Sequence, residues 1–134
     1  MTAPIVFISR WRIREGKRAE LEAMFALAVG LIGSSKPRTA LYAAYLNETG
    51  NELRIVHAVP DAAAMTDHFQ GSEERAASVE DMIELLGFEV YGAVPDAALD
   101  QLRREVAAVP GAALTLLPRS IGGYLRAPSW IQGP

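Results

Sequence analysis

Two histidines are the side chains of this sequence best suited to move a proton, because imidazole titrates near neutral pH. His68 lies in residues 60–69, which begin with Pro and Asp and therefore predict a short helix. His57 alternates with Ile55 and Val59 in a predicted strand, so its ring points either into the core or into a cavity. Each also has an ordinary interpretation: a hydrated helix residue for His68 and a hydrogen-bonded structural residue for His57.

An aromatic and a hydroxyl side chain share one face of the first predicted strand, residues 4–13. The indole of Trp11 could form a wall on which a planar molecule stacks, and Ser9 could donate one orienting hydrogen bond to that molecule. A tryptophan in such a strand is more often explained by plain interface packing. Both residues are candidates for substrate binding.

Tyrosines and an arginine on the other strands supply further candidates for contact with a small molecule. Tyr42 and Tyr45 fall on opposite faces of the second predicted strand, and Tyr91 lies on the fourth. Tyr45 and Tyr91 are selected as phenols that could reach a pocket, although most tyrosines in such sheets simply pack. Arg54 could hold an anionic or enolate oxygen, whereas a surface ion pair is its ordinary outcome.

Metal and nucleotide chemistry have little support in the sequence. The chain has no cysteine, and its two histidines and their nearby acids lack the spacing typical of metal ligands. Gly122 and Gly123 lie in the C-terminal tail rather than between a strand and a helix, so no phosphate-binding loop is predicted. We expect no metal and no cofactor.

The length and charge of the chain limit its classes of function. Its 134 residues suit one domain, and half of them are hydrophobic, which is enough for a core. A net charge of −3 lacks the positive field that nucleic-acid binding uses. The N-terminus has no signal-peptide pattern, and no apolar run reaches the roughly 20 residues of a membrane span. We expect a cytoplasmic protein that binds neither nucleic acid nor membrane.

The order of apolar patterns and turns predicts an α+β fold of the ferredoxin-like, split βαβ type. A helix with an apolar stripe follows the first strand and must lie on a sheet. Two strands then form a hairpin around Gly50, and two helical pieces replace a single crossover helix. The predicted elements are strands at 4–13, 39–48, 52–59 and 88–94, and helices at 17–32, 60–69 and 72–87.

The chain continues well beyond the fourth predicted strand. A further helix is predicted from Pro95 and Asp96 onward, followed by a strand at 112–117 and a loose tail. We therefore divide the chain into a ferredoxin-like core at 1–94 and a C-terminal helix and strand appendage at 95–134 of the same domain.

One face of the predicted sheet has no helix to cover it. The first strand is apolar on both faces at its centre, with Phe7 on one side and Val6 and Ile8 on the other. A second copy of the chain is the simplest cover, because two-fold pairing buries the same patch twice. The sequence therefore predicts a homodimer.

Three segments resemble the antibiotic biosynthesis monooxygenase family. Residues 7–17 resemble its opening strand and following turn, with Gly16 and Lys17 as the matching positions. Residues 60–69 are similar to its short helix, and residues 88–92 to its last strand. The similarity spans about residues 5–94 and implies a dimeric α/β barrel in which the short helix places a polar group, here His68, at the mouth of a cavity.

The resemblance implies a range of activities rather than one reaction. Members oxidise polycyclic aromatic molecules without metal or flavin, cleave heme, isomerise small metabolites or have no known activity. The heme-degrading branch requires Asn, Trp and His where this chain has Ser9, His68 and Ser78, so heme degradation is disfavoured. The leading hypothesis is a cofactor-independent monooxygenase-like enzyme for a small aromatic or quinol-type molecule. The alternative is a non-catalytic ligand-binding or structural homodimer.

Overall fold

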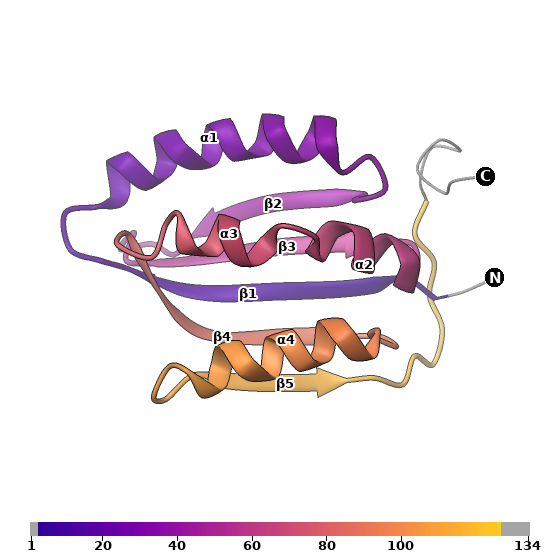
Figure 1. Cartoon of the computed structure of the whole chain (residues 1–134). Coiled ribbons are helices and arrows are strands. Elements are labelled where there is room, and N and C mark those ends of the chain that lie inside the picture. The colour runs from indigo at the N-terminus through magenta and orange to yellow at the C-terminus, as the bar shows by residue number, and fades with distance from the viewer. Residues whose placement is uncertain (1–2, 127–134) are drawn as a thin grey trace.

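A five-stranded sheet with its helices on one face makes up the computed structural model, which describes residues 3–126 (Figure 1). The strand order across the sheet is β2-β3-β1-β4-β5. The strands are β1 (Ile5–Ile13), β2 (Leu41–Leu46), β3 (Glu52–Val59), β4 (Ile83–Tyr91) and β5 (Ala113–Leu117). The helices are α1 (Arg18–Ser35), α2 (Ala62–Phe69), α3 (Ser72–Ala77) and α4 (Asp96–Ala107).

The predicted ferredoxin-like α+β arrangement is confirmed. β1 lies between β3 and β4 and is antiparallel to both, while β2 and β3 form the predicted hairpin. α1 connects β1 to β2, and the pair α2 and α3 connects β3 to β4. This connectivity places the middle of β1 at the centre of the sheet, facing the helices.

The faces of β1 follow the predicted alternation. Ile5, Phe7 and Ser9 are all buried on the helix side, while Val6 and Ile8 on the other side are half-buried. The register continues this face across the sheet, because each residue of one strand sits opposite a residue that points the same way. The helix-facing surface is therefore set by the sequence of β1.

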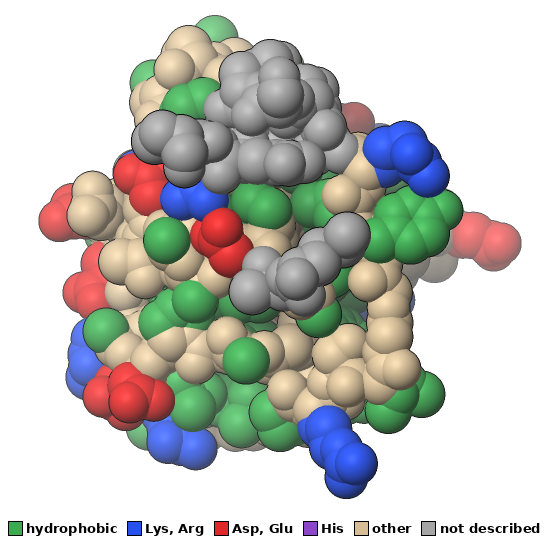
Figure 2. Space-filling model, turned by 90° about the vertical axis from the view of Figure 1, so that its right-hand side faces the viewer, with side chains coloured by type: hydrophobic (Ala, Val, Ile, Leu, Met, Phe, Trp, Pro, Cys, Tyr) green, Lys and Arg blue, Asp and Glu red, His purple; other side chains and the backbone are tan. Residues whose placement is uncertain are grey.

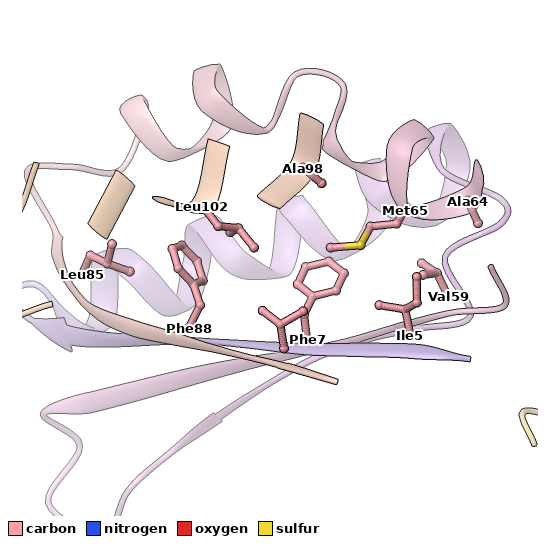
Figure 3. Close-up of a cluster of buried hydrophobic side chains, with 10 residues drawn as sticks. Ile5, Phe7, Val59, Ala64, Met65, Leu85, Phe88, Ala98 and Leu102 are labelled. Atoms are coloured by element: carbon pink, nitrogen blue, oxygen red, sulfur yellow. The ribbon is translucent and has the colours of Figure 1, made fainter. Parts of the chain in front are cut away.

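The main hydrophobic core lies between the sheet and the helices α2 and α4, as Figure 3 shows. The side chains of Phe7 and Phe88 rise from β1 and β4 toward the helices, where Met65 of α2 and Leu102 of α4 meet them. Both Met65 and Leu102 are fully buried. α4 is thus part of the core, although it follows the ferredoxin-like elements in the chain.

The predicted second helical stretch at 72–87 is wrong in its second half. α3 ends at Ala77, and Ile83 already belongs to β4, where it pairs with Ile13 of β1. Of the apolar residues in the predicted helical stripe, Ile83 and Leu86 belong to this strand, whereas Val79 and Met82 lie in the turn before it. A short apolar run fits both a helix and a strand, and here the long-range pairing with β1 stabilises the strand.

Gly87 lies at a β-bulge rather than at a helix end. The register between β1 and β4 shifts between Arg10 and Trp11, which leaves Leu86 as the extra residue. β5 runs parallel to β4 and passes so close that a Cβ at Gly87 would lie 2.4 Å from the backbone oxygen of Ala113. Only glycine allows the fifth strand to join the sheet at this point.

The segment after residue 94 extends the sheet. The predicted helix and strand correspond to α4 and β5, and β5 pairs with β4 from Ala113 to Leu117. The predicted loose tail continues to residue 126 without further helix or strand, and its last part, 127–134, lies outside the described residues. Within the described chain, no helix has the length and apolar character to cross a membrane.

Candidate functional site

A cavity of about 450 Å³ lies between the helix-facing surface of the sheet and the helices. Each of the four helices and the strands β1 to β4 contribute to its walls. The walls are mostly apolar, with aromatic rings from five different elements. These aromatic residues are Phe7, Trp11, Phe25, Tyr42, Phe69 and Phe88.

Helix α1 forms one wall of the cavity rather than packing tightly on the sheet. Only Leu21 and Ile32 of this helix are buried, near its two ends. Between them, Leu31 is 59% exposed, yet it lines the cavity together with Met24 and Ala28. The predicted apolar stripe is therefore present, but over the middle of the helix it faces an open space.

His57 is held rigidly at the wall formed by the sheet. Its Nδ1 donates a hydrogen bond of 3.1 Å to the carbonyl oxygen of Phe7, and its ring stacks on the Phe7 ring at 4.0 Å. Burial lowers the pKa of His57 to about 3; the charge of Arg75, and that of His68 once it is protonated in acid, act in the same direction, while the hydrogen bond to Phe7 opposes them. The ring is therefore neutral at pH 7, with its remaining lone pair on Nε2.

His68 is the second imidazole of the cavity. Asp61 caps α2 by accepting a hydrogen bond from the backbone of Ala64, and this predicted helix carries His68 in its last turn. The side chain is only 3% exposed, and no histidine is visible on the face of the molecule shown in Figure 2. Its Nδ1 shares a hydrogen bond of 2.7 Å with the hydroxyl of Thr39. The hydrated, half-exposed interpretation is thus wrong.

Two cations act on His68 from the C-terminal end of its helix. The guanidinium of Arg75 donates to the carbonyl oxygen of His68 at 2.8 Å, and Lys36 donates to the carbonyl oxygen of Asp67 at 2.7 Å. Burial, followed by the charges of Arg75 and Lys36, lowers the pKa of His68 to about 4. The cavity therefore holds two neutral imidazoles in a positive field.

Tyr42 completes this polar cluster. Its ring lies 5.3 Å from that of His57 and 6.1 Å from that of His68, and it stacks on Phe25 of α1 at 5.3 Å. Burial raises the pKa of the Tyr42 phenol, while the charge of Arg75 partly opposes the shift. A neutral phenol beside two neutral imidazoles can donate or accept hydrogen bonds without carrying charge.

The predicted pair Ser9 and Trp11 lies in the cavity wall. Nε1 of Trp11 donates a hydrogen bond of 2.8 Å to Oγ of Ser9, which fixes the orientation of the indole. The indole also meets the ring of Phe88 edge to face at 6.5 Å. A hydroxyl that accepts one hydrogen bond can still donate one, so this bond leaves the donor capacity of Ser9 unused.

The three remaining predicted contact residues lie on the opposite face of the sheet. Tyr45 pairs with Arg54 across β2 and β3, and neither lines the cavity. Tyr91 donates a hydrogen bond of 2.8 Å to Glu89 on that same helix-free face. The structure therefore brings together four of the predicted side chains, His57, His68, Ser9 and Trp11, and separates these three from them.

Several residues of the cavity were not selected from the sequence. Tyr42 could have been found, because the hairpin register sets it opposite His57 and on the same face. Arg75 had no such signal, since its role depends on how α3 packs against the end of α2. Glu105 belongs to α4, beyond the segment that resembles the family.

Within residues 3–126, no three His, Asp or Glu side chains gather in a way that could hold a metal ion. The polar groups of the cavity come instead as hydrogen-bonded pairs, such as His68 with Thr39 and Trp11 with Ser9. Such groups can bind a small molecule, fix its orientation and transfer a proton.

Comparison with known proteins identifies the fold. A scan against family models gives no match, and neither does a search of curated proteins. Among solved structures, MupZ from Pseudomonas fluorescens matches with a TM-score of 0.65 at 19% identity, covering 92% of this chain and 91% of MupZ. The part of this chain left uncovered is shorter than the segment Asp96 to Leu117, so the match includes much of α4 and β5.

Two further structures match over a smaller share of this chain. A candidate antibiotic biosynthesis monooxygenase from Bacteroides thetaiotaomicron matches with a TM-score of 0.55 at 20% identity, over 70% of this chain and 90% of its own. SnoaB from Streptomyces nogalater is a cofactor-independent oxygenase crystallised as its N63A mutant. It matches with a TM-score of 0.56 at 15% identity, over 66% of this chain and 90% of SnoaB. The resemblance expected from the sequence is thus confirmed at the level of the fold, which is that of the antibiotic biosynthesis monooxygenase structures.

Proposed function

We propose that this protein is a cofactor-independent monooxygenase that oxidises a small aromatic or quinol-type molecule in the cavity. The observation that carries the proposal is the pairing of neutral His57 and His68 with aromatic walls in one cavity of about 450 Å³. A volume of this size suits a small organic ligand. The likeness of fold to SnoaB, a cofactor-independent oxygenase, supports the same reaction class.

The cavity offers each contact that such a substrate requires. Phe7, Trp11 and Phe69 present rings against which a planar molecule can stack. A neutral imidazole of His68 can accept the proton that the substrate loses, and the charge of Arg75 favours the resulting enolate. Burial opposes both charges, and the cations Arg75 and Lys36 offset it only for the enolate, because they disfavour the imidazolium of His68.

The reaction balances without a further reactant when the substrate itself is the reductant. In an anthrone, the methylene carbon loses a proton, and the resulting enolate transfers electrons to molecular oxygen. The carbon then forms a bond to one oxygen atom and becomes a carbonyl, while the second oxygen atom leaves as water with the two hydrogens. The protein supplies proton transfer, orientation and exclusion of bulk water.

Replacing His68 by Ala is expected to lower kcat/KM for oxygen uptake about a hundredfold, because general base catalysis contributes gains of this order. The measurement is oxygen consumption with 1,8-dihydroxyanthrone and 1,4-naphthohydroquinone, corrected for uncatalysed oxidation. Thr66→Ala is the matched control, since Thr66 lies on the same helix but is exposed. Circular dichroism of both variants establishes that α2 remains folded.

The oxygenase proposal predicts catalysed uptake with at least one substrate of the panel. Uptake in the wild type that is unchanged in His68→Ala would remove His68 from the mechanism. Absence of catalysed uptake with every anthrone and hydroquinone tested would remove the oxygenase proposal itself.

A second candidate function, ligand binding without chemistry, is favoured by one observation. The pKa values of about 3 for His57 and about 4 for His68 make both rings weak bases. A carrier would bind the same aromatic molecules, quench the fluorescence of Trp11 and leave oxygen uptake at the uncatalysed rate.

We further propose that two copies of the chain pair through the helix-free face of the sheet. Val56 lies at its centre, between Ile8 of β1 and Ala43 of β2, and all three are half-buried within one copy. Leu41 and Tyr45 on the same face are exposed, the latter by 63%. Apolar surface of this kind favours association with an identical surface.

Placing a charge at the centre of this face is expected to convert a dimer into a monomer. Val56→Arg would bury an unpaired guanidinium twice in a two-fold interface, which is strongly unfavourable. Light scattering coupled to size-exclusion chromatography measures the mass, with Thr66→Arg on the opposite side as the control. A wild-type protein that elutes as a monomer would show that this face is not an interface.

A further inference from the structure

A second cavity, of about 460 Å³, adjoins the first at the end of the sheet where α3 and α4 lie together. The two helices are linked there by hydrogen bonds from Gln101 to Ser72 and from Arg104 to Glu73. Five residues line both cavities, so no more than one layer of side chains lies between the two spaces. These shared residues are Trp11, Ala76, Ile83, Gln101 and Glu105.

The junction between the cavities has fixed walls. The indole of Trp11 is held by its hydrogen bond of 2.8 Å to Ser9, and Ile83 is buried in β4. Gln101 is oriented by its hydrogen bond of 2.7 Å to Ser72. The fourth wall is the small side chain of Ala76, which leaves room that a larger residue would fill.

The two cavities differ in chemical character. The inner cavity has the aromatic walls and the histidine pair, whereas charged side chains of Arg14, Glu73, Glu80 and Arg104 line the outer one. Several of these charges have partners: Arg104 pairs with Glu73 at 3.3 Å, and Arg14 donates to the carbonyl oxygen of Glu80. The outer cavity is therefore a groove with mostly apolar walls whose charged side chains can meet hydrogen-bonding groups.

Glu105 lies where the aromatic inner cavity adjoins the charged outer cavity. Its side chain is half-buried and lines both cavities. Among the described residues of this groove, Glu84 forms an ion pair with Arg12 and Glu73 forms one with Arg104, and Glu105 belongs to neither pair. Burial, reinforced by the charge of Glu73, raises the pKa of this carboxyl group, while a hydrogen bond from Gln101 and the charge of Arg104 act against the shift. A half-buried acceptor at a junction is placed to select a donor on a ligand.

We propose that the two cavities form one binding space for an amphiphilic ligand, with an aromatic end beside the histidines and a hydroxyl-bearing arm in the outer groove. Glu105 accepts a hydrogen bond from the hydroxyl group of that arm. This inference rests on the proposed function only in that an aromatic molecule occupies the inner cavity. Glu105 then determines the specificity for a hydroxyl-bearing arm without taking part in the oxidation.

The test measures the affinity of three probes by isothermal titration calorimetry. The probes are 2-naphthol, 2-naphthol with a hydroxybutyl arm on its distal ring, and the same compound with a pentyl arm. In the wild type, the hydroxybutyl compound is expected to bind about tenfold more tightly than the pentyl compound, as a hydrogen bond to a charged acceptor would give. In Glu105→Leu this preference between the two arms disappears.

A steric variant tests the route of the arm independently of Glu105. Ala108 lines only the outer cavity, so Ala108→Trp should remove the gain from either arm and leave binding of 2-naphthol unchanged. Ala107→Trp is the matched control, because Ala107 is exposed and lines neither cavity. This variant remains informative if Glu105→Leu does not fold.

The outcomes separate this inference from the oxygenase proposal. Equal affinity of the two armed probes in the wild type, or a gain from the arms that survives in Ala108→Trp, would overturn the inference. Failure of all three probes to bind would overturn it together with the aromatic-ligand proposal. The expected affinities without any catalysed oxygen uptake would support the binding space and remove only the oxygenase.

Discussion

Acidification from pH 6.5 to pH 4 is expected to destabilise the folded protein steeply, because two buried histidines resist protonation. The pKa of His57 falls from its ordinary 6.5 to about 3 on folding, and that of His68 falls to about 4, in both cases mainly through burial. Below pH 6.5 the unfolded chain binds two protons that the folded chain does not. The free energy of unfolding therefore decreases as pH falls.

The size of this effect follows from the number of protons. Each histidine contributes about 1.4 kcal/mol per pH unit, so the two together give a slope of about 2.7 kcal/mol per unit near pH 5. The contribution of His68 is lost as pH falls to about 4, and that of His57 as pH falls to about 3. Over this window the loss is comparable with the whole stability of a small domain.

Urea unfolding at pH 7, 6, 5 and 4.5 measures the slope. The double variant His57→Gln/His68→Gln keeps polar side chains at both positions but removes their titration. Its stability should change far less over the same range, and the remaining change reports the carboxylates. Equal slopes in the wild type and the double variant would show that the histidines are not buried as neutral rings.

Replacing Phe7 by Ala is expected to lower the free energy of unfolding by about 3–5 kcal/mol, the usual cost of removing a buried phenylalanine ring. Phe7 belongs to the main core and is 4% exposed. Its ring stacks on His57 and meets His68 and Phe69 edge to face at 5.6 Å and 5.4 Å. The ring thus supports both the core and the two imidazoles.

The same substitution has a second expected result that a purely structural role would not produce. Loss of the ring opens His57 to water, so the pKa of His57 should rise toward 6.5 and the slope of stability against pH should become smaller. Urea unfolding at the same pH values measures both effects. Tyr124→Ala is the control for removing an exposed ring, with an expected change below about 0.5 kcal/mol. A Phe7→Ala protein as stable as the wild type would contradict the placement of Phe7 in the core.

The sequence by itself determined the ferredoxin-like core, because its signals are local. Alternation along β1 predicted which side chains share a face, and β3 was predicted with its observed bounds of Glu52 and Val59. The helix that carries His68 followed from Asp61, whose capping role needs only neighbouring residues. The shared face of Ser9 and Trp11 followed in the same way, since period-two alternation fixes a face.

Tertiary structure decided what depends on contacts between distant segments. Ile83 joined a strand because β1 offered it a partner, although its spacing also suited a helix. Tyr45 and Arg54 share a face, but only the packing of the helices shows that this face is not the cavity. Arg75 and Glu105 entered the cavity through the packing of α3 and α4, for which the sequence contains no local pattern. A residue's face is a local property, whereas the partner that covers it is set by the packing of the whole chain.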